Sequence, residues 1–242
     1  MNWKLLAGQL FDKIDRRVLK SNSSFINNNY PYRRNWIFDL KRRLPEPKVI
    51  FDIGAYIGDV SLEFNTRFPN AKIFSFEPVS ASFKTFTQNT NGVQNIKGNN
   101  FALGEKEESI EIPLFSEASI NTLKSANYDN PAISSEKIEV VRLDIFMAGN
   151  GIDHIDILKV DVEGFELEVL RGAGESISKI DCIVTEVGYM RSNTKTHFAD
   201  IDRFLEDNGF ELFNIYELRP LHNDRTRLFY SNNVYINKRL SS

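Results

Sequence analysis

The sequence predicts an α/β fold in which a doubly wound, mostly parallel sheet of about seven strands carries helices on both faces. Two observations predict it. From Lys48 onward, short apolar runs alternate with segments of helical periodicity, as strands alternate with crossover helices in a parallel sheet. The last two apolar runs follow each other without a helical segment, so we expect the final strand to turn back and run antiparallel at that edge.

Helices are expected ahead of the first strand. Between Met1 and Lys20, apolar side chains recur at spacings of three and four residues, which is typical of an amphipathic helix. Its apolar stripe would form a lid on the domain or join two copies of the chain in a homodimer, and its basic residues leave a role at a membrane surface open. Ser21–Tyr32, rich in Ser and Asn, is interpreted as a linker. A second helix is expected over Arg33–Leu44, ending before Pro45.

The chain is thus expected to divide into an N-terminal helical extension, residues 1–47, and a main domain, residues 48–242. The strands expected in the main domain are Val49–Ile53, Lys72–Phe76, Ile96–Phe101, Ile155–Val160, Cys182–Val187, Phe210–Tyr216 and Leu228–Ile236. The helices expected between them are Gly58–Arg67, Ser80–Asn89, Gly164–Arg171 and Thr196–Asn208.

An insertion follows the third strand of the main domain, at residues 104–151. Within it, Ser109–Phe115 and Lys137–Leu143 alternate enough to be strands, whereas Glu117–Ser135 is polar and rich in turn-forming residues. A loop of this length in a compact domain is usually functional or mobile. We therefore expect the acceptor of any reaction to enter beneath it.

Composition narrows the function classes. The 30 Lys and Arg nearly balance the 33 Asp and Glu, so a polyanion such as a nucleic acid is not expected as partner. A single cysteine, Cys182, excludes an intrachain disulfide and a cysteine-cluster metal site. The chain has no apolar run long enough to be a transmembrane segment, and polar residues interrupt Met1–Lys20 where a signal peptide would be apolar, so a cytoplasmic location is expected.

The most informative segment is a buried strand that ends in Asp52-x-Gly54-x-x-x-Gly58 and runs into a helix, which has the form of a nucleotide-binding turn. Gly54 would permit the tight turn and leave its backbone open to a ligand, and Gly58 would let the helix approach the sheet. The competing interpretation is that both glycines serve only strand-to-helix packing.

The next strand ends in Phe74-Ser-Phe-Glu77-Pro78, which places an acid at its carboxyl end. An acid there can accept hydrogen bonds from both hydroxyls of a ribose. The alternative is a surface carboxylate that caps the helix starting near Ser80. The turn and the acid together favour a nucleoside ligand.

The charge of the turn indicates which nucleoside. A dinucleotide pyrophosphate favours three glycines and a helix N-terminus without acids, whereas this turn has two glycines and carries Asp52 and Asp59. S-adenosylmethionine has a ribose and no phosphate, and it bears an ammonium and a sulfonium that carboxylates stabilise. It is therefore the expected cofactor.

The motifs occur in an order that is similar to a known family. They are Val49-Ile-Phe-Asp-Ile-Gly-Ala-Tyr-Ile-Gly58, Phe76-Glu-Pro78, Asn100-Phe-Ala-Leu-Gly104, Leu158-Lys-Val-Asp-Val-Glu-Gly-Phe-Glu166, Glu168-Val-Leu-Arg-Gly-Ala173 and Val184-Thr-Glu186. Over about Val49–Val187 the chain resembles the FkbM-type family of methyltransferases, although that family more often has Ala in place of Phe165.

The resemblance implies a Rossmann-like class I methyltransferase that depends on S-adenosylmethionine and methylates an oxygen of a sugar, a polysaccharide or a natural product. By position in the motifs, Asp52, Gly54, Tyr56 and Gly58 would surround the methionine part of the cofactor, Glu77 would hold the ribose and Asn100 would lie beside the adenine. The full set of residues expected at the cofactor is Asp52, Gly54, Ala55, Tyr56, Gly58, Glu77, Pro78, Asn100, Phe101 and Asp161.

The resemblance implies that Asp161, at the end of the fourth strand, lies at the methyl-transfer centre, and topology independently places it in the ligand crevice. Ligands of an open parallel sheet bind outside the carboxyl ends of the strands where strand order reverses, which is here between the first and the fourth strand. Asp52 and Asp161 would therefore face each other across one crevice, and Lys159 would neutralise neighbouring acids. Glu163 is open to two interpretations, capping the following helix or taking part in catalysis.

An alcohol acceptor needs a group that removes its proton. His197 and His222 follow the fifth and sixth strands, on the ligand side, and are candidate bases, whereas His154 lies on the far side. Asp161, Glu163 and Glu186 could bind a divalent metal, but strand-end carboxylates have simpler uses and no metal is predicted.

Two other function classes stay open. One is an NAD-dependent dehydrogenase on the same fold, and the other is a non-catalytic nucleotide-binding scaffold that acts through its N-terminal helix. The acceptor itself is not identified, since polar residues that could line a sugar-sized site, such as Tyr128 and Arg191, are common in any loop.

Overall fold

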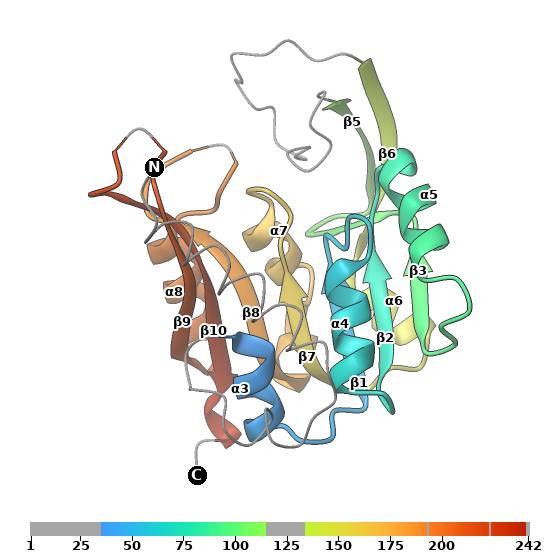
Figure 1. Cartoon of the computed structure of the whole chain (residues 1–242), viewed down its shortest axis with the longest axis horizontal. Coiled ribbons are helices and arrows are strands. Elements are labelled where there is room, and N and C mark those ends of the chain that lie inside the picture. Colours follow the sequence, from blue (N-terminus) through green and yellow to red (C-terminus); the bar gives the residue numbers. More distant parts are fainter. Residues whose placement is uncertain (1–34, 115–133, 193, 223, 241–242) are drawn as a thin grey trace, which may run out of the picture.

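We describe the fold from a computed structural model in which residues 35–114, 134–192, 194–222 and 224–240 are described. They form a seven-stranded sheet with helices on both faces and a smaller three-stranded sheet above one end of it (Figure 1). The expected helix over Met1–Lys20, the linker and most of the polar loop of the insertion lie outside the described residues. None of the helices in the described part combines the length and apolar character that crossing a membrane needs.

The main sheet confirms the predicted doubly wound topology. Its strands are β1 Val49–Ile53, β2 Lys72–Phe76, β3 Ile96–Asn99, β7 Ile155–Val160, β8 Ile180–Gly188, β9 Phe210–Pro220 and β10 Leu228–Asn237. The strand order is β3-β2-β1-β7-β8-β10-β9, so the order reverses between β1 and β7 as expected. The last strand, β10, is antiparallel as predicted, but its predicted position at the edge is wrong: it inserts between β8 and β9, so β9 forms the edge.

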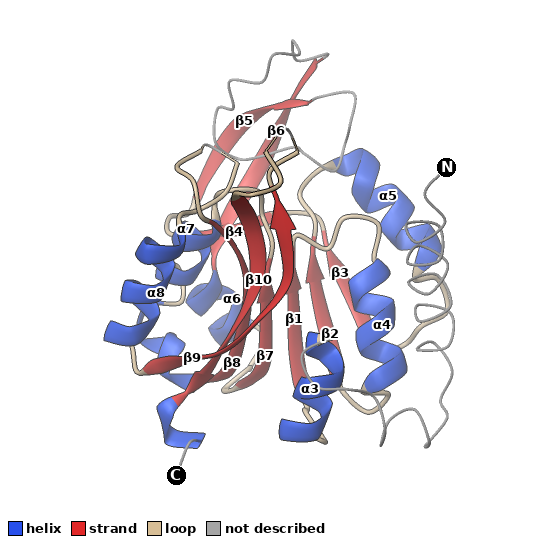
Figure 2. Cartoon of the chain, turned by 60° about the vertical axis from the view of Figure 1, so that its left-hand side comes forward, coloured by secondary structure: helices blue, strands red, loops and turns tan. Residues whose placement is uncertain are grey.

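Helices cover both faces of this sheet (Figure 2). On one face lie α3 Trp36–Arg43, α4 Asp59–Arg67 and α5 Ser80–Asn89, and on the other lie α6 Leu143–Gly149, α7 Glu166–Arg171 and α8 Phe198–Asp207. The described residues also form two short 3₁₀ helices, η2 Gly174–Lys179 and η3 Lys238–Leu240. The predicted helices that fall within the described residues are all present, with ends that differ by a few residues.

The alternation of side chains along β1 explains this two-sided packing. Ile50 packs in the core cluster beneath α3 and α4, whereas Phe51 and Ile53 pack in the cluster beneath α6, α7 and α8. Each of these side chains is at most 1% exposed, and burying one contributes roughly 1.5–3 kcal/mol. Asp52 is two residues after Ile50 on the strand, so its side chain points to the same face of the sheet, toward α4.

Helix α3 is part of this core, although it belongs to the segment expected as an N-terminal extension. The Asn35 side chain caps its first turn by accepting hydrogen bonds from the backbone N–H groups of Ile37 and Phe38. Trp36 packs against Phe64 of α4 with ring centroids 5.6 Å apart. The division of the chain at residue 47 therefore stays a prediction.

A buried polar contact joins α3 to β9. The hydroxyl of Tyr216, which is 2% exposed, donates to Oδ2 of Asp39 at 2.9 Å. Replacing Tyr216 by phenylalanine removes the donor and leaves the buried carboxylate with one partner fewer, so we expect a loss of about 1–3 kcal/mol in the free energy of unfolding in urea. Tyr56→Phe, at a ring that is 37% exposed, is the control and should cost about 0.5 kcal/mol or less. Equal effects of the two variants would contradict a stabilising Tyr216–Asp39 bond.

The chain around the start of the insertion differs from its prediction. The expected strand Ile96–Phe101 ends at Asn99, and a separate strand, β4 Ala102–Gly104, leaves the main sheet to pair with β6. The cause is Asn100, whose side-chain amide donates to the carbonyl oxygens of Glu77 and Pro78 and so turns the chain. The smaller sheet consists of β4, β5 Glu108–Leu114 and β6 Ser134–Arg142, in the order β4-β6-β5.

Helix α6, which follows β6 directly, was not predicted. It is a core element, because Leu143, Phe146 and Met147 are buried in the cluster beneath α7 and α8. Phe146 lies edge-on to Phe76 at the end of β2, with centroids 4.9 Å apart. The insertion is therefore anchored in the domain core at the end of the strand that carries Glu77.

Candidate active site

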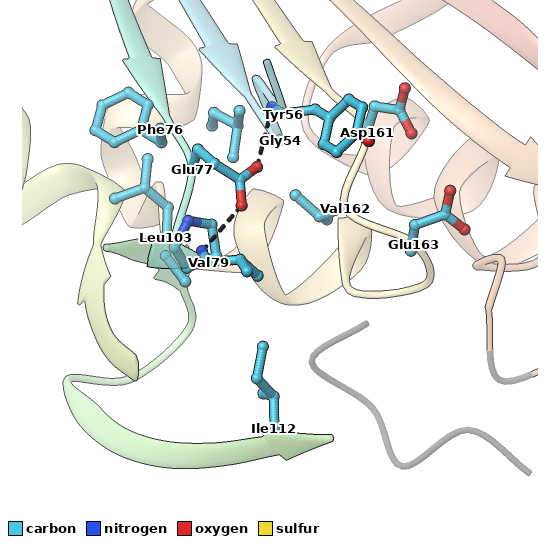
Figure 3. A pocket seen from close by; sticks show the side chains of 13 residues that line it. Gly54, Tyr56, Phe76, Glu77, Val79, Leu103, Ile112, Asp161, Val162 and Glu163 are labelled. Carbon is cyan, nitrogen blue, oxygen red and sulfur yellow. Dashed lines mark hydrogen bonds between the residues drawn. The ribbon is translucent and has the colours of Figure 1, made fainter. Parts of the chain in front are cut away.

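A cavity of about 270 Å³ opens at the carboxyl ends of β1, β2 and β7, where the strand order reverses (Figure 3). This volume is close to the lower end of the range for small-molecule sites. The lining residues are Ile53, Gly54, Tyr56, Phe76, Glu77, Pro78, Val79, Ala102, Leu103, Ile112, Asp161, Val162 and Glu163. One wall is apolar and includes Ile112, which reaches the cavity from β5 of the insertion.

Glu77 is the acid at the centre of this cavity. Its Oε2 accepts a hydrogen bond from the backbone N–H of Tyr56 at 2.9 Å, and its Oε1 accepts one from the N–H of Val79 at 2.9 Å. Burial raises the pKa of Glu77 to about 7, although these two bonds and the charge of Lys159 oppose the rise. The two backbone bonds fix the carboxylate toward the cavity, where it can accept further bonds from a diol.

The turn after β1 is held tightly against the end of β7. Gly54 has φ +78°, and a Cβ on it would lie 1.8 Å from the backbone oxygen of Asp161. The glycine is thus required by the approach of β7 as well as by the turn itself. Tyr56 has φ 49°, which is unusual for a residue other than glycine, and turns its ring to the cavity mouth.

Lys159 links the two aspartates that were expected to converge. Its Nζ lies 3.3 Å from Oδ1 of Asp52 and 3.5 Å from Oδ2 of Asp161, and it donates to the carbonyl oxygen of Gly54 at 3.2 Å. Burial alone would lower the pKa of the Lys159 ammonium, but the two carboxylates outweigh burial and raise it. Lys159 therefore neutralises these acids, as the sequence suggested.

Asp52 itself lies behind the cavity. It is fully buried, and its Oδ2 accepts a hydrogen bond from Ser61 of α4 at 2.6 Å. Of the two aspartates only Asp161 is in the lining, with about a third of its side chain exposed. Asp52 thus acts on the cavity through Lys159 and the turn.

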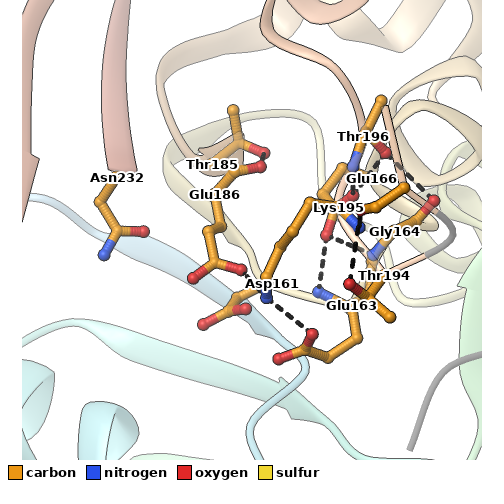
Figure 4. Close-up of polar contacts among 12 residues, drawn as sticks. Asp161, Glu163, Gly164, Glu166, Thr185, Glu186, Thr194, Lys195, Thr196 and Asn232 are labelled. Atoms are coloured by element: carbon orange, nitrogen blue, oxygen red, sulfur yellow. Dashed lines mark hydrogen bonds and ion pairs between the residues drawn. The ribbon is translucent and has the colours of Figure 1, made fainter. Parts of the chain in front are cut away.

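A second group of charged residues adjoins the cavity on the side of β8 (Figure 4). The Nζ of Lys195, on the loop between β8 and α8, lies 2.6 Å from Oε2 of Glu163 and forms an ion pair with Glu186. Burial raises the pKa of Glu163 to about 7 and also raises that of Glu186, although Lys195 opposes both rises. Against its own burial, the carboxylates raise the pKa of Lys195, so its ammonium is charged at neutral pH.

The loop that presents Asp161 and Glu163 is fixed by Glu166. This fully buried carboxylate accepts hydrogen bonds from the backbone N–H groups of Val162 at 3.3 Å, Gly164 at 2.9 Å and Thr196 at 3.2 Å. Of the two interpretations given for Glu163, the helix-capping one is not observed, because the N-cap of α7 is Phe165 with no side-chain cap. The Glu163 side chain instead reaches Lys195 and the cavity, with a backbone φ of 52°.

The structure brings together six of the residues predicted at the site, namely Gly54, Tyr56, Glu77, Pro78, Asp161 and Glu163. Other predicted residues support the lining from behind it. Ala55 is buried, Gly58 is the N-cap of α4, Asn100 holds the loop after Glu77, and Phe101 packs on Phe76 at 5.7 Å. Neither candidate histidine is in the lining: His197 caps α8 through its Nδ1, and His222 is exposed between β9 and β10.

Sequence reasoning missed Lys195 and the apolar wall. Lys195 has no motif around it and reaches the site only because the loop after β8 folds back. Ile112 could have been predicted, since it lies in the alternating pattern of the expected strand Ser109–Phe115. Val79, Ala102 and Leu103 carry no chemical signal of their own.

The cavity fits a nucleoside with a cationic extension. Glu77 offers a carboxylate for a ribose diol, and the apolar wall suits a flat base. The carboxylates of Asp161 and Glu163 lie on the side of β7 and favour a cation there. Carboxylate oxygens of Asp161, Glu163 and Glu186 also lie within 4.8 Å of one another, as the ligands of a metal ion would, but the ammonium of Lys195 is paired with two of them.

Comparison with known proteins shows which family the chain is similar to. The family described as the methyltransferase FkbM domain matches residues 52–212. Methyltransferase 1 of Beauveria bassiana is 30% identical over 186 residues, 69% of this chain and 73% of its own length. Hexuronic acid methyltransferase AglP of Haloferax volcanii is 25% identical, covering 59% of this chain and 56% of its own. The 2-O-methyltransferase NoeI of Sinorhizobium fredii is 26% identical, and the match covers 59% of this chain and 63% of that protein.

The crystal structure of a methyltransferase FkbM from Methylobacillus flagellatus shares the fold, with a TM-score of 0.50 at 20% identity over 79% of this chain and 43% of that chain. The family match spans the turn after β1, Glu77 and the loop after β7, which line the cavity, and it also includes Glu186 of the adjoining charged group. The family match excludes the alternative of an NAD-dependent dehydrogenase. The chain belongs to the FkbM family and is a methyltransferase that uses S-adenosylmethionine.

Proposed function

We propose that the protein methylates a hydroxyl oxygen of a sugar, a polysaccharide or a natural product, with Glu163 as the base. The observation that carries this proposal is the position of Glu163, a carboxylate in the cavity lining whose pKa burial raises to about 7. A group with this pKa accepts a proton efficiently near neutral pH. The names of two relatives, a hexuronic acid methyltransferase and a 2-O-methyltransferase, support a saccharide hydroxyl as acceptor.

For the cofactor, we assign the ribose to Glu77 and the adenine ring to the apolar wall that includes Val79, Leu103 and Ile112. S-adenosylmethionine, when bound, supplies a methyl group activated by a positively charged sulfur. Gly54, Tyr56 and Asp161 surround the part of the cavity nearest β7, where the charge of Asp161 would stabilise the cation.

In this proposal, a residue of the loop after β7 removes the proton of the acceptor. The acceptor hydroxyl becomes a nucleophile as its proton passes to the carboxylate of Glu163, and alignment of the acceptor supplies much of the rate. Asp161, two residues earlier on the same loop, orients the reactants. The positions of His197 and His222 outside the lining favour Glu163 over both histidines.

The affinity for S-adenosylhomocysteine tests the cofactor assignment. In Glu77→Gln, an amide N–H₂ would face the N–H of either Tyr56 or Val79, and one acceptor for the ribose is lost. We expect calorimetry to show binding about 10- to 100-fold weaker than for the wild type. Glu107→Gln, at an exposed carboxylate, is the control and should bind as the wild type does. Unchanged affinity in Glu77→Gln would remove Glu77 from the ribose site.

The acceptor atom is tested directly. Purified protein is incubated with methyl-labelled S-adenosylmethionine and a panel of sugars, oligosaccharides and hydroxylated natural products, and the products are analysed by NMR. A new methyl ether on an acceptor oxygen is the expected product. A methyl group on nitrogen or carbon would contradict the proposal while leaving the family assignment intact.

A further inference from the structure

The ammonium of Lys195 lies among three carboxylates that come from two strand ends. Asp161 and Glu163 follow β7, and Glu186 is on β8. Ligand atoms of the three acids lie within 4.8 Å of one another, and Lys195 pairs with Glu163 and Glu186. Both Lys195 and Glu186 are 6% exposed, so this is an interior contact and not a surface ion pair.

The chain on both sides of Lys195 is tied to the site, which fixes where the ammonium lies. The backbone N–H of Gly188 donates to the carbonyl oxygen of Thr196 at 2.8 Å, and the Thr196 hydroxyl donates to the carbonyl of Gly164 at 3.1 Å. The N–H of Lys195 itself donates to Ser192 at 3.2 Å. The loop after β8 is thereby held to the loop that carries Glu163, and Lys195 is a preorganised part of the site.

Close carboxylates at the edge of a cavity repel one another, and a divalent cation is the common way to hold such a group together. Here a side chain of the protein supplies the positive charge at that place (Figure 4). The ring of Tyr230 on β10, whose centroid lies 5.1 Å from Nζ, covers the ammonium from another side. The titratable groups that surround it are thus Asp161, Glu163, Glu186, Glu166 behind the loop, and Tyr230.

We propose that Lys195 is a positioning residue for methyl transfer, whose ammonium does the work of a divalent cation by holding Glu163 and Glu186 in place at the cavity. This inference rests on the proposed role of Glu163. Lys195 contributes charge and geometry only, and no proton leaves it. The wild-type reaction should then proceed equally well with and without added divalent metal.

Lys195→Met is the main test, because methionine is similar in shape to the lysine side chain up to Cε and lacks only the charged terminal ammonium. We expect kcat to fall about 10- to 100-fold, as for residues that orient a reacting group through contact, while binding of S-adenosylhomocysteine stays within about twofold. The midpoint of the pH–kcat profile should move upward by about one pH unit, since a cation beside a carboxylate lowers its pKa. Lys84→Met, at an exposed position on α5, is the matched control and should change none of these values.

Binding of Mn²⁺, followed by electron paramagnetic resonance, gives a readout independent of turnover. The wild type should not bind the ion at this cluster, whereas Lys195→Met should bind it through the three carboxylates and lose it again when Glu186→Gln is added. Wild-type binding of Mn²⁺ that disappears in Glu186→Gln would overturn the inference, because the cluster would then be a metal site. An unchanged kcat and pH midpoint in Lys195→Met would overturn it as well.

Lys195→Arg covers the case in which the methionine variant does not fold. It keeps the charge, so its pH midpoint should stay near that of the wild type, and a midpoint shifted upward would count against the inference. Failure of the proposed function has a different signature. If the wild type binds S-adenosylhomocysteine but methylates no hydroxyl, the proposed acceptor atom is wrong, whereas the Mn²⁺ experiment still decides the role of Lys195.

Discussion

Replacing Gly54 by alanine should lower the free energy of unfolding by about 2–5 kcal/mol and abolish binding of S-adenosylhomocysteine. Two costs combine. The backbone conformation, with φ +78°, is unfavourable for any residue with a Cβ by about 1–2 kcal/mol. The new Cβ would also lie 1.8 Å from the backbone oxygen of Asp161, and forcing an atom into a packed site typically costs about 1–3 kcal/mol. Relief of the clash must separate β1 from β7 at the floor of the cavity.

Gly92 provides a matched control for the first of these costs. Its φ is +81°, nearly that of Gly54, but a Cβ on it would meet no atom within 4 Å. Gly92→Ala should therefore cost about 1 kcal/mol, with unchanged cofactor affinity. Urea unfolding and calorimetry of the two variants separate backbone strain from the clash. If both variants lose the same stability and both bind the cofactor, the contact between the turn and β7 does not shape the cavity.

Most of the fold could be predicted because its signals are local. The strands β1, β2 and β7 have the predicted bounds, since each is a short apolar run with a turn or a charged residue on either side. The cavity position follows from the same information, because parallel strands bring Glu77 and Asp161 to one edge of the sheet. The identity of the cofactor needed the additional argument from charge.

What could not be predicted depends on contacts between distant residues. Asn100 ends β3 because its amide meets two carbonyl groups beyond β2, and no pattern in the sequence reveals that pairing. Asp52 has the residue type of a ligand-binding acid, but the alternation of side chains along β1 points it away from the cavity, toward Ser61 and Lys159. Lys195 lies more than thirty residues from Glu163 along the chain, and only the fold of the loop after β8 brings the two together.

Glu163→Gln should reduce kcat by about 100- to 10,000-fold, which is the usual contribution of a positioned general base. The amide oxygen can still accept a hydrogen bond from Lys195, so the loop should keep its shape and calorimetry should show unchanged affinity for S-adenosylhomocysteine. The observed φ of 52° at this residue supports a functional role, since strain of this kind concentrates at active sites.

The proposed role of Glu163 also predicts how kcat depends on pH. A base works only when it is deprotonated, and the pKa of Glu163 is raised to about 7, so kcat of the wild type should fall about tenfold for each pH unit below 7 and level off above it. In Glu163→Gln this dependence should vanish, whereas Glu175→Gln, at an exposed carboxylate of η2, should keep both the wild-type rate and its profile. A Glu163→Gln enzyme that retains the wild-type kcat and midpoint would mean that the proton leaves the acceptor by another route. Because the Lys195→Met variant should shift the same midpoint upward, the two profiles together distinguish the group that takes the proton from the group that holds it in place.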